Sequence, residues 1–263
     1  MLMLMLMLGL GLCLGTPSHA ELDRASLVRA GASVLKIEVR RQQGDYALGS
    51  GVVVGDGLVV TNCHVTHDGV GVFVLRGDTR WRVLEQAVDR EHDLCLLRVP
   101  GLAAASVVLG RAAELKTGQP VAAVGYTGGQ GIQTSVGAVV ALHCHDGGHV
   151  IQSDNWFSSG ASGGALFDEH LNLVGVLTFR LRGGAAHYFA APVEWLQPLL
   201  DGRLAFRAVE PGGAERSSYW QREPALQPQF LQDAALSRAD EADWTQALGL
   251  SCAAQPDTPA ATL

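Results

Sequence analysis

The chain has 263 residues, of which 48% are hydrophobic and 17% are charged, and 32 are glycines. A composition this apolar can bury a core, which excludes a disordered chain, and the length suits one two-lobed domain or two small ones. The formal net charge is −7, and no stripe of Lys and Arg with interleaved aromatic residues is present. We therefore expect no nucleic-acid partner.

Residues 1–20 predict a signal peptide. The stretch from Met1 to Gly15 is apolar, and the small-x-small ending Ser18-His19-Ala20 places the expected cleavage after Ala20. No Lys or Arg precedes the apolar run, so an uncleaved anchor and a mis-assigned start are the alternatives. The run is shorter than the roughly 20 residues of a membrane span. We expect a periplasmic or secreted protein with no stable membrane insertion after cleavage.

Short apolar segments separated by glycine-containing turns predict an all-β domain over residues 21–204. A first series covers residues 33–41, 49–54, 58–62, 71–75, 81–87 and 94–99. After a break near residues 100–115, a second series covers residues 120–125, 137–143, 150–152, 164–167, 173–179 and 188–191. Two groups of about six strands each predict two β-barrels in tandem.

Helical spacing is confined to the later part of the chain. The segment Val193–Leu200 is the first with a helical period, and residues 229–248 show a second. From about Gly202 the composition turns to Gly, Pro, Gln, Ala and Glu. We expect residues 205–263 to form a partly helical C-terminal extension, and favour a packing role for it over a separate functional module.

The sequence Ser159-Gly160-Ala161-Ser162-Gly163-Gly164 is typical of an acyl-transfer nucleophile. Glycines let the backbone turn sharply, expose the serine Oγ and allow consecutive N–H groups to converge into an oxyanion hole. Taken alone, the motif is equally compatible with a glycine-rich β-turn.

A serine hydroxyl also needs a base and a residue that orients the base. His64 follows the apolar strand that ends in Thr61-Asn62-Cys63, and Asp93 precedes the apolar strand Leu94-Cys95-Leu96-Leu97. Each is separately compatible with an ordinary loop histidine or a turn aspartate. The order His, Asp, Ser, with separations of 29 and 69 residues, favours a catalytic triad.

These blocks resemble the trypsin-like serine proteases of the HtrA/DegP type. The similarity runs from about Val34 to Leu200 and includes Gly49–Val54 with Leu58–Val65, Asp93–Leu97, Ile151–Asp154 with Gly160–Leu166, Leu173–Val176 and Phe189–Pro192. It implies a chymotrypsin-like double six-stranded β-barrel and no metal or cofactor. The residues after 204 do not supply the strand pattern of a PDZ module.

The resemblance assigns roles to the matching residues. Ser162 is the expected nucleophile, His64 the general base and acid, and Asp93 the residue that holds the imidazole tautomer. Backbone N–H groups of Gly160 and Ser162 are expected to bind the oxyanion. By the same resemblance, the substrate pocket is lined by Trp156, Phe157, Thr178, Phe179, Arg180 and Tyr188.

The chain departs from the family pattern at several positions. Ala161 stands where trypsins carry an aspartate, so the ion pair that matures trypsin zymogens is not expected. No acidic residue lies at the base of the expected pocket, which argues against a preference for Lys or Arg. Trp156 and Tyr188 either restrict the pocket to small residues or belong to core packing.

Five cysteines are present, and Cys13 is expected to leave with the signal. The other four allow three disulfide connectivities in an oxidising compartment. Since the triad must bring His64 and Asp93 together, Cys63 and Cys95 are expected to be close. Both a disulfide that braces the triad and a pair of buried free thiols remain compatible with the sequence.

The function predicted from the sequence is a secreted serine endopeptidase that acts on polypeptide through an acyl-enzyme intermediate. The alternatives are a catalytically silent protease fold that binds peptides and an esterase using the same triad. The intact triad favours the endopeptidase.

Overall fold

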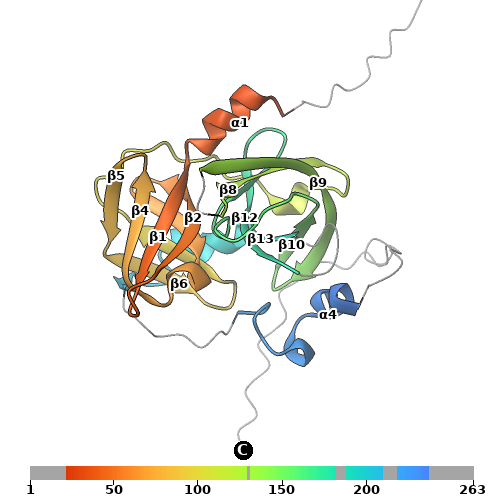
Figure 1. Ribbon diagram of the computed structural model, residues 1–263. Helices are drawn as coiled ribbons and strands as arrows, with labels where there is room; N and C mark the ends of the chain where they lie inside the picture. The colour runs from red at the N-terminus through yellow and green to blue at the C-terminus, as the bar shows by residue number, and fades with distance from the viewer. Residues whose placement is uncertain (1–21, 129–130, 182–187, 210–217, 237–263) are drawn as a thin grey trace, which may run out of the picture.

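The polypeptide forms two β-lobes side by side (Figure 1), in a computed structural model that describes residues 22–128, 131–181, 188–209 and 218–236. All pairings between adjacent strands are antiparallel. The expected all-β fold with two lobes is confirmed.

The first lobe is a sheet in the order β14-β6-β7-β3-β2-β1-β4-β5. Its strands are β1 (Val34–Arg41), β2 (Tyr46–Gly55), β3 (Leu58–Asn62), β4 (Gly69–Arg76), β5 (Thr79–Val83), β6 (Glu85–Asp89), β7 (Leu94–Arg98) and β14 (Arg207–Ala208). This sheet is a half-barrel with β5 and β14 at its edges, and with the second lobe it matches the expected double barrel. The predicted strand over residues 81–87 is two strands, β5 and β6, and β14 from the chain's later part pairs with β6.

The second lobe is a closed six-stranded barrel in the order β10-β13-β12-β11-β8-β9. Its strands are β8 (Pro120–Tyr126), β9 (Ile132–His145), β10 (Gly148–Ser153), β11 (Ala165–Phe167), β12 (Leu173–Arg180) and β13 (Tyr188–Pro192). Every residue of β12 except Arg180 is buried, because the strand is covered on both faces. Strand β12 therefore supplies a rigid support for whatever packs on its end.

Alternating side chains place the core of the first lobe. Along β1, Leu35, Ile37 and Val39 point inward and are almost fully buried, as the period of two predicts for a strand with one face in the core. Burial of a side chain of this size stabilises a fold by roughly 1.5–3 kcal/mol. A polar substitution at Ile37 would place an unpaired polar group in this core.

Helices are short and lie mainly outside the sheets. They are α1 (Arg24–Gly31), α2 (Cys63–Thr66), α3 (Gln197–Leu200) and α4 (Gln229–Leu236), with 3₁₀ turns at Ala112–Glu114, Val193–Leu196 and Pro224–Leu226. Helix α1 was not expected, although its cap is readable in retrospect, since the Asp23 carboxylate accepts a hydrogen bond from the Ser26 amide. The predicted helix over Val193–Leu200 is a 3₁₀ turn followed by α3. Part of the second predicted helix is α4, and its continuation to residue 248 lies outside the described residues.

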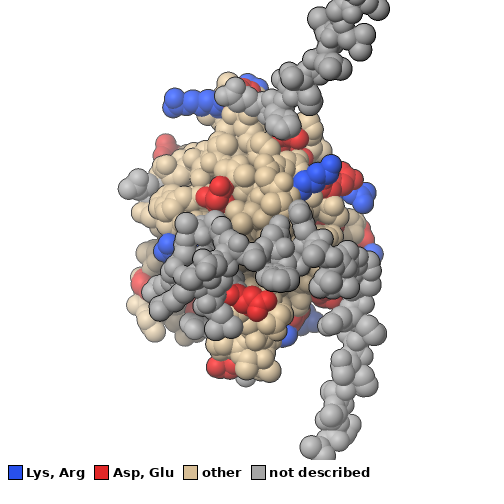
Figure 2. All heavy atoms as spheres, turned by 90° about the vertical axis from the view of Figure 1, so that its right-hand side faces the viewer, with Lys and Arg blue, Asp and Glu red and all other residues tan. Residues whose placement is uncertain are grey.

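The described C-terminal residues pack against the rest of the domain. Tyr219 is fully buried and Leu231 almost so, and both belong to the core cluster that joins the two lobes. On the face of the molecule in Figure 2, the described Lys and Arg side chains lie apart and form no continuous basic patch. Within the described ranges, no helix is long and apolar enough to cross a bilayer.

Candidate active site

His64 lies on α2, which follows β3 without a loop. Asn62 ends the strand, and its side-chain amide donates to the carbonyl oxygen of Asp93 at 3.0 Å. Asn62 is fully buried, so this bond fixes the distance between the segment carrying His64 and the segment carrying Asp93. About a quarter of the His64 side chain, 23%, is exposed, which leaves one side of the ring open to a substrate.

Asp93 immediately precedes β7 and is 2% exposed. Its backbone is left-handed, with φ of 57°, a conformation that aspartate adopts more readily than most residues but that still costs roughly 1 kcal/mol. The turn directs the carboxylate at α2. Oδ2 lies 2.6 Å from His64 Nδ1, and Oδ1 accepts from the backbone amide of His64 at 2.8 Å.

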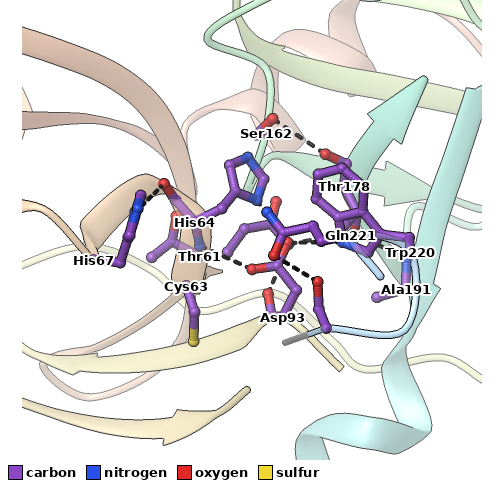
Figure 3. Close-up of polar contacts among 12 residues, drawn as sticks. Thr61, Cys63, His64, His67, Asp93, Ser162, Thr178, Ala191, Trp220 and Gln221 are labelled. Atoms are coloured by element: carbon purple, nitrogen blue, oxygen red, sulfur yellow. Dashed lines mark hydrogen bonds and ion pairs between the residues drawn. The ribbon is translucent and has the colours of Figure 1, made fainter. Parts of the chain in front are cut away.

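This arrangement determines how the imidazole can act. A carboxylate against Nδ1 favours the tautomer that carries its proton on that nitrogen, which leaves Nε2 as the acceptor. The imidazole lies between Asp93 and Ser162 (Figure 3). The chemistry open to such a ring is to take a proton from a hydroxyl on its Nε2 side.

Ser162 lies in the turn between β10 and β11. Gly160 and Gly163 flank it with φ of 98° and 84°, values that favour glycine. A Cβ at Gly163 would also lie 2.1 Å from the carbonyl oxygen of Ser50, so no other residue fits there. The Ser162 hydroxyl donates to the carbonyl oxygen of Thr178 at 3.2 Å (Figure 3).

Two backbone amides next to the hydroxyl are available for a ligand. The carbonyl of Ser159 and that of Ala161 each accept a backbone amide at 2.8 Å. In a trans peptide the N–H points opposite to the carbonyl, so the amides of Gly160 and Ser162 point away from those partners. Neither amide donates to any residue in the described part of the chain.

Cys63 and Cys95 form a disulfide with a Cα–Cα distance of 5.0 Å. Of the two alternatives that the sequence left open, the disulfide is therefore the one observed. It links the residue before His64 to the strand that Asp93 precedes, across a sequence separation of 32 residues. Cys144 on β9 is also disulfide-bonded.

The residues expected to line the substrate pocket divide into buried and exposed ones. Phe157, Thr178 and Phe179 are buried, whereas Trp156, Arg180 and Tyr188 are exposed or partly exposed. Phe157 is buried in the core of the second lobe and contacts Tyr188, with ring centroids 5.0 Å apart, and Trp156 beside it is 58% exposed. Thr178 presents its carbonyl to Ser162, whereas the Phe179 ring is stacked between two other aromatic rings. Arg180 ends β12 and is exposed.

A groove of about 700 Å³ lies elsewhere, between α1 and the strands β8 and β9. Its lining is mainly apolar and includes Leu27, Val28, Ile132 and Val136. None of His64, Asp93 and Ser162 lines it, so its position gives no reason to assign the reaction to it.

Sequence reasoning missed one residue at the centre of this site. Trp220 comes from the C-terminal extension, and its indole N–H donates to Asp93 Oδ2 at 3.1 Å. The only sequence signal was the pair Tyr219-Trp220, two large aromatic residues within an otherwise polar stretch. Large aromatic residues in such a context often have a partner elsewhere in the fold.

The two antiparallel β-lobes define a chymotrypsin-like fold. The first lobe carries a histidine and a buried aspartate, and the second a serine between glycines, which is the arrangement of the serine endopeptidase class. Residues 49–176 match the family described as trypsin-like peptidase domain. Together with the fold, this match shows a trypsin-like protease domain of the HtrA type.

Proteins similar to this chain are described as serine endoproteases. The chain is 33% identical over 163 residues to the probable periplasmic serine endoprotease DegP-like of Ectopseudomonas mendocina, covering 59% of this chain and 34% of that protein. A protein of the same description from Chlamydia trachomatis is 27% identical over 208 residues, covering 75% and 39%. The chain thus spans between a third and two fifths of these relatives' length.

Solved structures agree on the fold. The HtrA-type protease AlgW with a tripeptide has a TM-score of 0.63 and 27% identity, over 72% of this chain and 64% of that chain. The Rv3671c protease from M. tuberculosis in its active form has a TM-score of 0.61 and 24% identity, over 73% and 88%. The second comparison bears on the fold alone.

Proposed function

We propose that the protein is a serine endopeptidase that cleaves peptide bonds through Ser162, His64 and Asp93. The observation that carries the proposal is the 2.6 Å contact between His64 Nδ1 and Asp93 Oδ2. Because Nδ1 is bound to Asp93, the other ring nitrogen, Nε2, is left on the side of Ser162. Ser162 lies in a turn that requires glycine at positions 160 and 163. A merely structural histidine would not need an open Nε2.

The reaction proceeds through an acyl-enzyme. Ser162 Oγ attacks the scissile carbonyl carbon while His64 Nε2 takes the hydroxyl proton, and Asp93 stabilises the imidazolium that forms. The tetrahedral intermediate collapses when His64 returns the proton to the leaving amine, which breaks the C–N bond. A water molecule then attacks the ester by the same route and releases the second product.

The oxyanion of each tetrahedral intermediate is bound by the amides of Gly160 and Ser162. The support for this assignment is that both amides lack acceptors among the described residues. Each such donor contributes about 3 kcal/mol of transition-state stabilisation in comparable sites. No step of this mechanism requires a metal or a cofactor.

The substrate is an unfolded or exposed polypeptide. Its side chain before the cleaved bond is received by Trp156, Tyr188 and Arg180, which are exposed or partly exposed and lie over the buried Phe157, Thr178 and Phe179. The absence of an acidic side chain from this set argues against a Lys or Arg preference. Small and apolar side chains are the expected match, because Tyr188 packs on Phe157 and narrows the space.

The working compartment is the periplasm or the cell exterior. Residues 1–20 have the pattern of a cleavable signal. Disulfides at Cys63–Cys95 and at Cys144 fit an oxidising environment. The relatives from Ectopseudomonas and Chlamydia are named as periplasmic proteins, which agrees with this assignment.

The test measures degradation of unfolded casein and labelling of Ser162 by a fluorophosphonate. Ser162→Ala and His64→Ala should each abolish casein degradation, and the double variant should be no worse than the worse single, because the residues act as one unit. Exposed Ser106 and His170 provide matched controls, and Ser106→Ala and His170→Ala should retain activity.

The same measurements separate the alternatives. A silent peptide-binding module would leave the folded wild-type protein unlabelled. An esterase would label at Ser162 and hydrolyse p-nitrophenyl acetate but leave casein intact. Either result, or casein degradation by Ser162→Ala, contradicts the proposed function.

A further inference from the structure

The carboxylate of Asp93 is nearly sealed from solvent and receives three hydrogen bonds. Two come from His64, through its ring and its backbone amide, and the third comes from the indole N–H of Trp220 at 3.1 Å. Trp220 and the Nδ1 of His64 bond the same oxygen, Oδ2. The nearby Thr178 hydroxyl does not take part, because it donates to the carbonyl of Val176 at 2.8 Å.

The Trp220 side chain is held on two sides. Its ring stacks on Phe179 at the end of β12, with centroids 4.8 Å apart and planes 9° apart. It also meets the His64 imidazole edge to face, with centroids 5.5 Å apart (Figure 3). An indole packed in this way has one orientation available, and in that orientation its N–H points at Asp93.

The backbone around Trp220 is attached to the loop that carries Asp93. The amide of Tyr219 donates to the carbonyl of Glu91 at 3.1 Å, and Arg222 forms an ion pair with the Glu91 carboxylate. Glu91 lies two residues before Asp93. These bonds therefore hold the segment of Trp220 against the loop of Asp93, next to the hydrogen bond between the two side chains. The fully buried ring of Tyr219 anchors the same segment in the core.

The downstream side is fixed as well. The side-chain amide of Gln227 donates to the carbonyls of Trp220 and Arg222, both at 2.9 Å. Gln232 on α4 donates in turn to the carbonyl of Gln227 at 2.7 Å. The bonds from Gln232 to Gln227 and from Gln227 to Trp220 connect α4 to the active site.

We propose that Trp220 is a positioning residue of the active site, and that residues 218–233 belong to the catalytic apparatus instead of forming a packing extension. This inference rests on the proposed function of His64 and Asp93. The indole N–H prevents the carboxylate from rotating away from Nδ1, and the edge-to-face contact restricts the imidazole ring. The protease domain is therefore complete only when a segment 127 residues beyond Asp93 is in place.

The first test replaces the donor and keeps an aromatic ring. Trp220→Phe should lower kcat for casein about tenfold, the size expected for losing one hydrogen bond to a buried carboxylate, with KM little changed. Trp195→Phe is the matched control, because Trp195 is a buried tryptophan whose indole N–H bonds a backbone carbonyl, that of Asp146, at 3.1 Å. The control should retain kcat.

A second test does not need turnover, so it separates this inference from the proposed function. In a Ser162→Ala background, the proton on His64 Nδ1 is observed by NMR. Loss of the indole donor concentrates charge on Oδ2, so Trp220→Phe should move that resonance downfield, and Trp195→Phe should not. If the wild-type protein cleaves nothing yet this shift appears, the proposed function fails and the positioning role stands.

A double-mutant cycle distinguishes positioning from packing. In an Asp93→Asn background, Trp220→Phe should cause little further loss, since its acceptor has already changed. An equal loss in both backgrounds, or an equal loss in Trp195→Phe, would overturn the proposal. So would a Trp220→Phe variant more active than wild type, which would show that the indole obstructs the substrate.

Discussion

The carboxylate of Asp93 contacts His64 at two points, the ring nitrogen Nδ1 and the backbone amide, at 2.6 and 2.8 Å. The first contact orients the imidazole and the second attaches the carboxylate to the start of α2. Asp89, four residues upstream, has a different partner, since its carboxylate binds His92 at 2.7 Å. The two aspartates therefore differ in role despite their proximity in the sequence.

Asp93→Asn is expected to reduce kcat by about 10⁴-fold without unfolding the protein, because the amide favours the wrong imidazole tautomer. Asp89→Asn is the matched control and should retain most of the activity. Casein degradation and circular dichroism of both variants test this. A loss of several orders of magnitude in Asp89→Asn with little loss in Asp93→Asn would contradict the assignment.

Removing the Cys63–Cys95 disulfide should destabilise the domain. The bond closes a separation of 32 residues, for which the chain-entropy argument gives about 3–4 kcal/mol. The double variant Cys63→Ala/Cys95→Ala should show that decrease in the free energy of unfolding in urea. Reductant alone is a poorer test, because Cys144 is also disulfide-bonded. An unchanged urea midpoint would show that the bond does not constrain the unfolded chain.

His92 links the two lobes through two carboxylates. Its ring nitrogens lie 2.7 Å from Asp89 on the first lobe and 2.8 Å from Asp146 on the second, and Trp195 stacks on the ring at 4.1 Å. Burial opposes the charged form, but the hydrogen bonds and charges of Asp89 and Asp146 raise the pKa of His92 above its ordinary 6.5. The neighbouring His145 has its pKa lowered, first by burial.

A histidine with a raised pKa stabilises the fold fully below its unfolded pKa and loses that contribution as pH rises through the folded value. The Tm of the wild type, compared with that of His92→Gln, should therefore fall as pH rises above about 6.5. The Tm of the variant lacks the contribution of His92 protonation. Thermal unfolding from about pH 5.5 to about pH 8.5 measures the difference. Parallel profiles of the two proteins across that range would contradict the prediction.

Activity should not require a unique, free N-terminus. Ala161 is fully buried against Gly125, and it has no group that could pair with an amine. Proteins that begin at Glu21, with or without N-terminal acetylation or an extension, should degrade casein equally. Ala161→Asp should instead destabilise the fold by several kcal/mol, because it buries an unpaired charge, whereas Ala161→Gly should cost less. Activity restricted to the free N-terminus would show that this account of Ala161 is wrong.

Most strands were predictable because their pattern is local. Along β2 and β3 the apolar residues and the Gly55–Gly57 turn signal a hairpin, and the structure has that hairpin with Val52 paired with Val60. The division of residues 79–89 into β5 and β6 was not predictable from the run itself. Whether the chain continues or bends there depends on the strand with which each half pairs. The first half, β5, pairs with β4, and the second half, β6, pairs with β7.

By itself, the sequence determined the two-lobed β fold and the candidate triad, because periodicity, turn residues and the motif around Ser162 act over a few positions. Tertiary structure alone decided the open edge of the first lobe, the pairing of Cys63 with Cys95, and the approach of Trp220 to Asp93. The last two features join residues 32 and 127 positions apart, and no local preference specifies which distant groups meet. Such contacts form because burying Tyr219 and stacking Trp220 on Phe179 compensate for ordering the segment that carries them.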